Sequence, residues 1–280
     1  MKLITRIYIF IISLVCISFF SQAQIPNQLK AACWISPSFS QNGTERPPVT
    51  FEKSFQTNKP IRSAKLYITS HGIYEARTNG QRVAEDYFTP GYTTYEKRLQ
   101  YQVYEIKDQL AKSNSIKVTV ADGWWRGYIK YTQNNYGTDL ALLCALEIIY
   151  TDNSSEIIQT DKSWTCASGK IRYSDMYNGE KIDKSYITKE PSAVEVVNAS
   201  KDILIPSSSP AVKKHERFTA IKSYGDSIYD FGQNIAGWIR FNVQGQRKDS
   251  IVIKYAEVLD NSNDLYTKPL RAAKATDVLS

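Results

Sequence analysis

The stretch Ala64-Lys65-Leu66-Tyr67-Ile68-Thr69 carries an apolar residue at every second position, alanine, leucine and isoleucine, on one side of the chain. Successive side chains of a β-strand point to opposite faces, so this period of two predicts a strand with one buried face. The same alternation recurs at Ser115 to Val120, Trp238 to Gln244 and Ser250 to Glu257, and no long helical stripe interrupts it. Many short strands bounded by turn residues are typical of β-sandwiches, so we expect an all-β fold.

Three further segments refine this expectation. Leu140 to Tyr150 is a long apolar stretch that ends in β-branched and aromatic residues before the turn-forming residues 151–154, and we interpret it as a central strand rather than a buried helix. Asn79-Gly80 predicts a hairpin turn, because both residues tolerate positive φ and strand-like segments flank them. Lys107 to Lys112 is the one segment that favours a helical turn.

Ile205 to Pro210 is the best candidate for a linker between two domains. Its two prolines surround a serine run, and such a segment is expected to interrupt a strand ladder and to bury little surface. We therefore predict a larger, jelly-roll-like β-sandwich over residues 24–204, a linker at 205–212, and the start of a second, incomplete β-sandwich at 213–280.

The N-terminus has the three-part pattern of a secretory signal peptide. Two basic residues precede the apolar run Ile7 to Phe20, and small residues follow, so we predict cleavage after Ala23 and removal of residues 1–23. An uncleaved anchor and a lipoprotein modified at Cys16 are the alternatives, although no small residue directly precedes that cysteine. The run is shorter than the roughly 20 residues of a membrane span, so no stable span is expected. We expect export to the periplasm or the extracellular medium.

Charge and cysteine usage exclude several classes of protein. The net charge of +7 is spread along the chain, whereas nucleic-acid binding needs a concentrated basic face, so no nucleic-acid partner is expected. Cys33, Cys144 and Cys166 allow at most one disulfide, and Cys144 lies in an apolar run typical of a buried position. The two histidines, His71 and His215, are far apart with no cysteine nearby, which argues against zinc.

A series of short motifs rich in glycine and aromatic residues runs along the chain. In the larger module they are Gly72-Ile73-Tyr74-Glu75, Asn79-Gly80-Gln81-Arg82-Val83, Pro90-Gly91-Tyr92-Thr93-Thr94-Tyr95, Lys97-Arg98-Leu99-Gln100-Tyr101-Gln102, Asp122-Gly123-Trp124-Trp125-Arg126-Gly127, and Tyr177-Asn178-Gly179-Glu180 with Asp183. Beyond the linker they are Tyr229-Asp230-Phe231-Gly232-Gln233-Asn234 with Gly237-Trp238, Ala256-Glu257-Val258-Leu259, and Leu270-Arg271-Ala272-Ala273-Lys274-Ala275-Thr276-Asp277. In this order and spacing they resemble the N-terminal β-domains of bacterial α-L-rhamnosidases of glycoside hydrolase family 78. The resemblance covers nearly the whole chain after residue 23 and implies rhamnose-containing glycans as partners.

The same resemblance bears on catalysis. In that family an (α/α)6 barrel follows these β-domains, and an acid and a base in the barrel hydrolyse the rhamnosyl bond with inversion. The acidic signature of the barrel, Asp-Cys-Pro followed closely by an arginine and a glutamate, does not occur here. The resemblance therefore implies no catalytic residues in this chain and a missing C-terminal catalytic domain. We expect scaffold and carbohydrate-binding surfaces of an exported α-L-rhamnosidase; a free-standing rhamnose-binding module and the fragment of a truncated gene are the alternatives.

Asp122 to Gly127 is the richest candidate site. Sugar rings stack on aromatic side chains through their apolar faces, while charged groups exchange hydrogen bonds with sugar hydroxyls. Asp122, Trp124, Trp125 and Arg126 are therefore candidate carbohydrate-binding residues. The alternative is that a tryptophan packs in the core while Arg126 pairs internally.

Asn135 and Tyr136, in the following loop, complete the candidate set. The family's N-terminal sandwich resembles modules that bind L-rhamnose, in some cases with calcium, and Asn134, Asn135 and Tyr136 would be its hydroxyl or calcium ligands. Calcium takes six to eight oxygens, usually including carboxylates, and Asp139 is the only acid nearby, so we expect no cofactor and no metal site. The alternative for this loop is an ordinary turn.

Overall fold

The computed structural model describes residues 25–41, 43, 45–245 and 249–280. The predicted signal peptide, with Cys16 inside it, lies outside these residues. In the part of the chain that the structure describes, no helix is long and apolar enough to cross a membrane.

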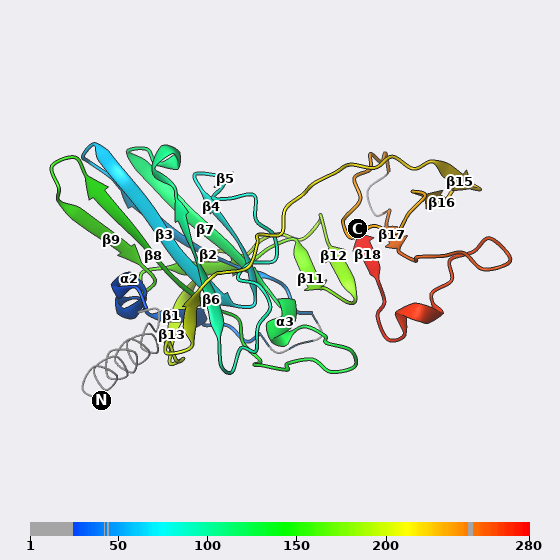
Figure 1. Ribbon diagram of the computed structural model, residues 1–280, viewed down its shortest axis with the longest axis horizontal. Helices are drawn as coiled ribbons and strands as arrows, with labels where there is room; N and C mark the ends of the chain where they lie inside the picture. Colours follow the sequence, from blue (N-terminus) through cyan, green and yellow to red (C-terminus); the bar gives the residue numbers. More distant parts are fainter. Residues whose placement is uncertain (1–24, 42, 44, 246–248) are drawn as a thin grey trace, which may run out of the picture.

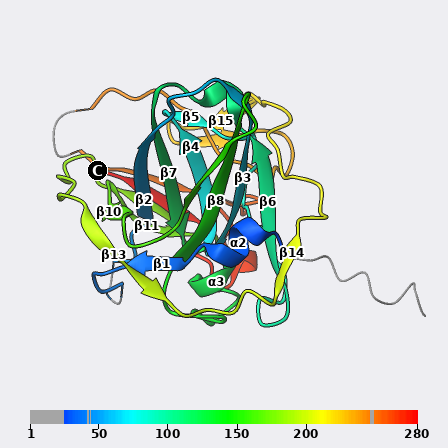
Figure 2. The same ribbon diagram turned by 90° about the vertical axis from the view of Figure 1, so that its left-hand side faces the viewer.

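The first part of the chain forms one large sheet of twelve strands, ordered β14-β6-β3-β8-β1-β13-β10-β2-β7-β4-β5, with β9 added beside β8. Its strands are β1 (Trp34–Pro37), β2 (Val49–Gln56), β3 (Ile61–His71), β4 (Ile73–Thr78), β5 (Gln81–Arg82), β6 (Leu99–Glu105), β7 (Ser113–Ala121), β8 (Ala141–Tyr150), β9 (Ser155–Gln159), β10 (Thr165–Ser168), β13 (Ser192–Val197) and β14 (Leu204–Pro206). The short helix α2 (Asn27–Ala31) precedes these strands, and η1 (Lys107–Gln109) and α3 (Gly123–Arg126) lie between them in sequence. The sheet curls so that its two halves face each other (Figures 1 and 2). The predicted all-β fold is confirmed.

The main core lies between these two halves. Leu66 and Ile68 of β3 and Leu146 of β8 belong to the same buried cluster as Phe51 of β2 and Val118 of β7. All five side chains have no exposed surface. Burying large apolar side chains contributes about 1.5–3 kcal/mol each, so this face dominates the stability of the module. The predicted strands at 64–69 and 115–120 are confirmed as parts of β3 and β7.

The long apolar stretch is confirmed as the central strand β8. It pairs antiparallel with β3 on one side and with β9 and β1 on the other. Leu142 and Cys144 point into the main core, whereas Leu143 and Ala145 pack in a second cluster with Leu29 of α2. Because both faces of β8 are buried, its sequence shows no alternation of apolar and polar residues. The predicted burial of Cys144 is confirmed.

Two local predictions are also confirmed. Asn79 (φ 50°) and Gly80 (φ 83°) form the tight turn between β4 and β5. The segment Lys107 to Lys112 contains the short 3-10 helix η1. Cys33, Cys144 and Cys166 are all free.

Two smaller sheets, ordered β11-β12-β18-β17 and β15-β16, lie outside the large sheet. Their elements are β11 (Ile171–Asp175), β12 (Gly179–Ile182), β15 (Lys222–Tyr224), β16 (Ile228–Asp230), β17 (Ile251–Lys254) and β18 (Thr276–Leu279), with η2 (Lys268–Leu270) between the last two. The β11–β12 hairpin lies between the two parts of the molecule (Figure 1). It precedes residue 204 in sequence, yet β12 pairs in parallel with β18. The two parts therefore share a sheet; the domain boundaries themselves stay a prediction.

Two predictions about residues 205–280 need correction. Trp238 to Gln244 forms no strand, whereas Ser250 to Glu257 contains the short strand β17. The alternation of apolar and polar residues determines which side chains share a face of a strand. A strand forms only where a neighbouring strand accepts and donates the backbone hydrogen bonds, and the alternation does not provide that neighbour. Trp238 instead packs on Tyr87 of the first part, with 4.8 Å between ring centroids.

The predicted break at Ile205 and Pro206 is also wrong. Both residues belong to β14, which pairs in parallel with β6, and Pro206 lies beside Tyr101. Because β14 is the edge strand, the ladder tolerates a proline that donates no hydrogen bond. The N–H of Ser207 then donates to the carbonyl oxygen of Tyr101 at 2.9 Å, so irregular chain begins only after the serine run has started.

Candidate functional site

The candidate segment Asp122 to Gly127 follows the end of β7 and folds into the single helical turn α3. Gly123 has a φ of 50°, and a Cβ atom at this position would lie 2.5 Å from Cγ2 of Ile73. Only glycine fits both the left-handed backbone and this close contact. The turn brings Asp122 and Arg126 together as a buried ion pair, with Nε of Arg126 donating to Oδ1 of Asp122.

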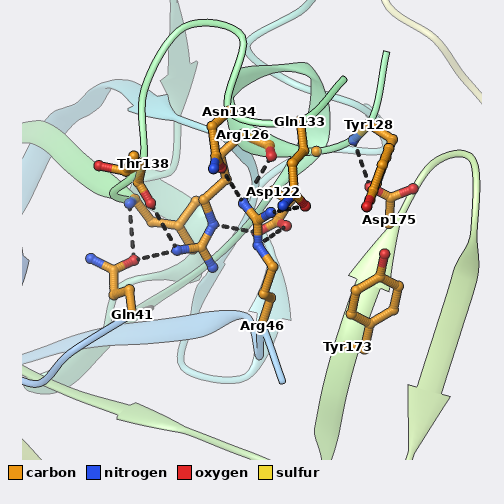
Figure 3. A network of polar contacts seen from close by, with 12 residues as sticks. Gln41, Arg46, Asp122, Arg126, Tyr128, Gln133, Asn134, Thr138, Tyr173 and Asp175 are labelled. Atoms are coloured by element: carbon orange, nitrogen blue, oxygen red, sulfur yellow. Dashed lines mark hydrogen bonds and ion pairs between the residues drawn. The ribbon is translucent and has the colours of Figure 1, made fainter. Parts of the chain in front are cut away.

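A second arginine completes this polar network (Figure 3). Nε of Arg46 lies 3.0 Å from Oδ2 of Asp122, and the Arg46 guanidinium also donates to the backbone oxygen of Arg126 and to Oδ1 of Asn134, each at 2.8 Å. Burial raises the pKa of the Asp122 carboxyl, and the two guanidinium groups oppose that rise. The network therefore ties the segment before β2 to α3 and to the loop that follows it.

The other members of the network hold the same loop. Oε1 of Gln41 accepts from Nη1 of Arg126 and from the backbone N–H of Leu140, both at 2.9 Å. Oδ2 of Asp175 accepts from the backbone N–H of Tyr128 at 2.8 Å. The side chains of Asp122 and Arg126 are each 1% exposed, so their contacts are with protein groups. Their predicted carbohydrate-binding role stays a prediction. Their hydrogen bonds and ion pairs hold the loop after α3 in place.

Trp125 is part of a stack of three rings. His71 lies between the two indoles, with centroids 4.2 Å from Trp34 and 3.9 Å from Trp125. Burial lowers the pKa of His71 to about 4, so the imidazole is neutral at physiological pH. Gly137 packs against Trp125 so closely that a Cβ would lie 2.6 Å from the indole ring, and Nε1 of Trp125 donates to the backbone oxygen of Asp139 at 3.1 Å. The ring of Trp125 is thus largely occupied by protein contacts.

Trp124 has different surroundings. Its half-buried ring meets Phe88 edge-on, with centroids 6.2 Å apart, and Tyr92 at 5.5 Å. Phe88 and Tyr92 are 40% and 52% exposed. Tyr92 also approaches Tyr136, with 3.3 Å between their hydroxyl oxygens. Of the predicted residues, Trp124 and Tyr136 are therefore brought to one accessible aromatic face.

Asn135 serves the turn in which it lies. Its Oδ1 accepts from the Thr132 hydroxyl at 2.7 Å, and its Nδ2 donates to the backbone oxygen of Thr132 at 3.2 Å. The neighbouring amide oxygen of Asn134 faces the guanidinium of Arg46. A cation beside that oxygen would be repelled, so this loop does not fit calcium. Among the described residues, no group of three or more histidine, cysteine or acidic side chains could hold a metal ion.

The sequence-based prediction missed four residues of this region. Phe88 and Tyr92 form the accessible face, His71 fixes Trp125, and Arg46 neutralises Asp122. Pro90 to Tyr95 is one of the motifs in the sequence, but the pattern of strands and turns does not predict that it lies beside Trp124. Only the fold brings the segment between β5 and β6 next to α3.

Comparison with known proteins identifies the family. The model of the α-L-rhamnosidase N-terminal domain matches residues 59–216, and that of the bacterial α-L-rhamnosidase concanavalin-like domain matches residues 222–279. An α-L-rhamnosidase of Streptomyces avermitilis is 33% identical over 237 residues, which are 79% of this chain and 23% of that protein. One of Formosa agariphila is 31% identical over 257 residues, 85% of this chain and 28% of that protein. The chain thus spans about a quarter of the length of these curated relatives.

Solved structures agree. An α-L-rhamnosidase of Aspergillus terreus has a TM-score of 0.84 at 32% identity and covers 91% of this chain, which matches 32% of that protein. The Streptomyces avermitilis α-L-rhamnosidase complexed with L-rhamnose has a TM-score of 0.79 at 30% identity, over 84% of this chain and 24% of that protein. The chain therefore belongs to the α-L-rhamnosidase family, of which it carries the N-terminal domain and residues of the concanavalin-like domain.

Proposed function

We propose that this chain supplies the N-terminal scaffold and a carbohydrate-binding surface of an exported α-L-rhamnosidase, which hydrolyses terminal α-L-rhamnosyl residues of glycans or glycosides. The observation that carries the proposal is the family match in both parts of the chain, residues 59–216 and 222–279. The shared sheet supports the scaffold role, because pairing of β12 with β18 fixes the two β-domains to each other.

We assign the hydrolytic step to a C-terminal catalytic domain rather than to these residues. An inverting site needs two carboxyls about 6.5–9.5 Å apart with room for a sugar and a water. The buried carboxyls of the described residues are engaged elsewhere: Asp122 pairs with two arginines, and Asp175 accepts backbone N–H groups. The two oxygens of Asp277 accept from the Glu180 N–H and the Tyr255 hydroxyl.

Release of the aryl group from an aryl α-L-rhamnoside tests the catalytic part of the proposal. We expect turnover when this chain is joined to the family's catalytic domain, and none from residues 24–280 alone. An aryl β-glucoside is the control substrate. Turnover by residues 24–280 alone would contradict the scaffold role, and a joined protein that cleaves the glucoside instead would contradict the rhamnosidase activity.

Export is the second part of the proposal and rests on residues 1–23. N-terminal sequencing of the protein recovered outside the cytoplasm is expected to begin at Gln24. A Cys16→Ser variant separates the alternatives, because it abolishes anchoring only in a lipoprotein. Full retention in the cytoplasm would contradict export.

A free-standing rhamnose-binding module is the second candidate, favoured by the exposed rings around Trp124. Calorimetric titration of residues 24–280 with millimolar L-rhamnose, with and without calcium, tests binding independently of hydrolysis. We expect saturable heat that does not depend on calcium. No heat together with no effect of Trp124→Ala would reject a binding role for this chain.

A further inference from the structure

The chain between β14 and β15 forms what we call the connecting segment, residues 207–219. All of these residues are exposed, and they belong to no helix or strand. The segment runs from the large sheet to β15 (Figure 1). Among the described residues, its backbone beyond Ser207 takes part in one hydrogen bond, from the N–H of Tyr87 to the oxygen of Val212 at 2.9 Å. The rest of this backbone is open to another protein.

The middle of the connecting segment is basic. Lys213, Lys214 and Arg217 lie within five residues, and Glu216 is the one acid between them. In the part of the chain that the structure describes, these three side chains take part in no ion pair. A lysine that the protein itself leaves unpaired presents a charged, flexible side chain with three hydrogen-bond donors to an acidic partner.

Endoproteases of the trypsin class require both features together. Their specificity pocket carries an acidic group that receives the side chain before the cleaved bond. Cleavage concentrates in exposed segments whose backbone is not hydrogen-bonded in a helix or a sheet, because the protease must bind that backbone itself. In the connecting segment this costs a single hydrogen bond, the one between Tyr87 and Val212.

The pair Lys97-Arg98 shows why exposure alone is not sufficient. Both residues are exposed, but their N–H groups donate to the oxygen of Thr94 at 2.8 and 2.9 Å. The next residue, Leu99, is fully buried and begins β6. A protease reaches this pair only after the turn and the start of β6 have opened, so the pair is a matched comparison for Lys213 and Lys214.

We propose that the connecting segment is a processing site, at which a serine endoprotease with an acidic specificity pocket cleaves the chain after Lys214. The reaction is hydrolysis. The C–N bond between Lys214 and His215 breaks, the hydroxyl of a water molecule joins the carbonyl carbon of Lys214, and the nitrogen of His215 takes up the proton. The chain then has a new carboxylate at residue 214 and a new amine at residue 215.

The two neighbouring basic residues are poorer positions for the cut. Lys213 directly follows Val212, whose oxygen is held by Tyr87, so the bond after Lys213 lies closer to the fixed part of the segment. Arg217 directly follows Glu216, and a carboxylate there is repelled by the acidic pocket of the protease. The bond after Lys214 has neither disadvantage.

Cleavage at this place leaves the two pieces associated. The β11–β12 hairpin precedes the cut, yet β12 pairs with β18, which follows the cut. The rings of Tyr87 and Trp238 also lie on opposite sides of the cut in sequence, and their centroids are 4.8 Å apart. Processing therefore converts the chain into a two-chain protein that keeps the shared sheet and loses only the covalent link.

Limited digestion of residues 24–280 with trypsin tests the site independently of export and of sugar binding. We expect the first products to be residues 24–214 and 215–280, identified by intact mass and by an N-terminal sequence that begins at His215. Lys213→Gln combined with Lys214→Gln should slow the loss of intact chain about tenfold, because most remaining bonds become cleavable only after local opening.

Lys97→Gln combined with Arg98→Gln is the matched control. It removes the same two charges from exposed residues, but it should leave the rate of cleavage unchanged because that pair is held in a turn. Equal unfolding midpoints of both double variants and the unmodified protein show that a change in rate is not caused by unfolding.

The protein recovered outside the cytoplasm of its source cells shows whether the site is used. We expect a second N-terminus at His215, with both pieces in one size-exclusion peak. Intact chain alone would refute processing even where trypsin cuts as expected, and separated pieces would refute the two-chain product. First cleavage by trypsin elsewhere would refute the site; this includes cleavage after Arg247 or Lys248, which lie outside the described residues.

Discussion

His71 carries a clear pH dependence at the scale of a single residue. Burial between Trp34 and Trp125 lowers its pKa from 6.5 to about 4. Between these two pH values the imidazole stays neutral in the folded chain, whereas it takes up a proton in the unfolded chain. Titration of His71 therefore does not reduce the free energy of unfolding well above pH 6.5. As the pH falls below this value, protonation of the unfolded chain lowers the free energy of unfolding, by about 3 kcal/mol near pH 4. Urea unfolding of His71→Phe, which keeps a ring in the stack, should show a much smaller loss.

His215→Gln is the control for that measurement, because His215 is exposed and packs against no ring that the structure describes. It should follow the unmodified protein at every pH. If His71→Phe lost as much stability between pH 6.5 and 4 as the unmodified protein, the acid sensitivity would belong to other groups.

A substitution at Gly137 tests how tightly Trp125 is packed, because this glycine contacts the indole ring. A methyl group at this position would lie 2.6 Å from the indole ring, so Gly137→Ala must displace the ring or the loop. We expect a loss of about 1–3 kcal/mol in the free energy of unfolding. Gly169→Ala is the matched control, since nothing lies within 4 Å of its added atom. Equal stability of the two variants would show that Trp125 is not tightly held.

At the scale of elements, local patterns predicted what depends on local chemistry. Three such predictions were confirmed: the strands β3 and β7 from their alternation, the strand β8 from its apolar run, and the Asn79-Gly80 turn. Each depends only on the faces of one strand or on the φ angles of one turn. The strand expected at Trp238 to Gln244 was wrong because pairing depends on a neighbour that periodicity does not identify.

The site was predictable only in part, for the same reason. Asp122 to Gly127 was recognisable as a segment rich in aromatic and charged residues. Whether each ring would face solvent or protein depended on His71, Gly137, Phe88 and Tyr92, which come from three other parts of the chain. Sequence adjacency made Trp124 and Trp125 look equivalent, and tertiary packing separates them.

The seam between β12 and β18 depends on one carboxylate. Asp277 accepts from the N–H of Glu180 at 2.7 Å and from the Tyr255 hydroxyl at 2.6 Å. Asp277→Ala leaves both donors without this partner, at a cost of about 1–3 kcal/mol. Hydrogen exchange in β11 and β12 should become about tenfold faster, while β3 and β8 keep their protection. Asp108→Ala, an exposed substitution on η1, is the control and should leave hydrogen exchange unaltered in both regions. If exchange were also unchanged in Asp277→Ala, this carboxylate would not be what stabilises the pairing of β12 with β18.

At the scale of the whole molecule, the two parts are held together by more than the exposed segment after β14. The β11–β12 hairpin pairs with β18, Tyr87 packs on Trp238, and the N–H of Tyr87 donates to the oxygen of Val212. A specific protease site inserted after Ser209 would cut only the exposed connection. Because these contacts remain, the two pieces should elute together in size-exclusion chromatography at tens of micromolar.

Two variants assign that association to its contacts. Asp277→Ala weakens the shared sheet and Trp238→Ala removes the ring contact with Tyr87, so the doubly substituted protein should separate after cleavage. Uncut, it should still elute at the size of the intact chain, which excludes unfolding as the cause of separation. If the unmodified pieces separated as soon as they were cut, the shared sheet would be too weak to fix the two β-domains, and the scaffold role would have to rest on the connecting segment alone.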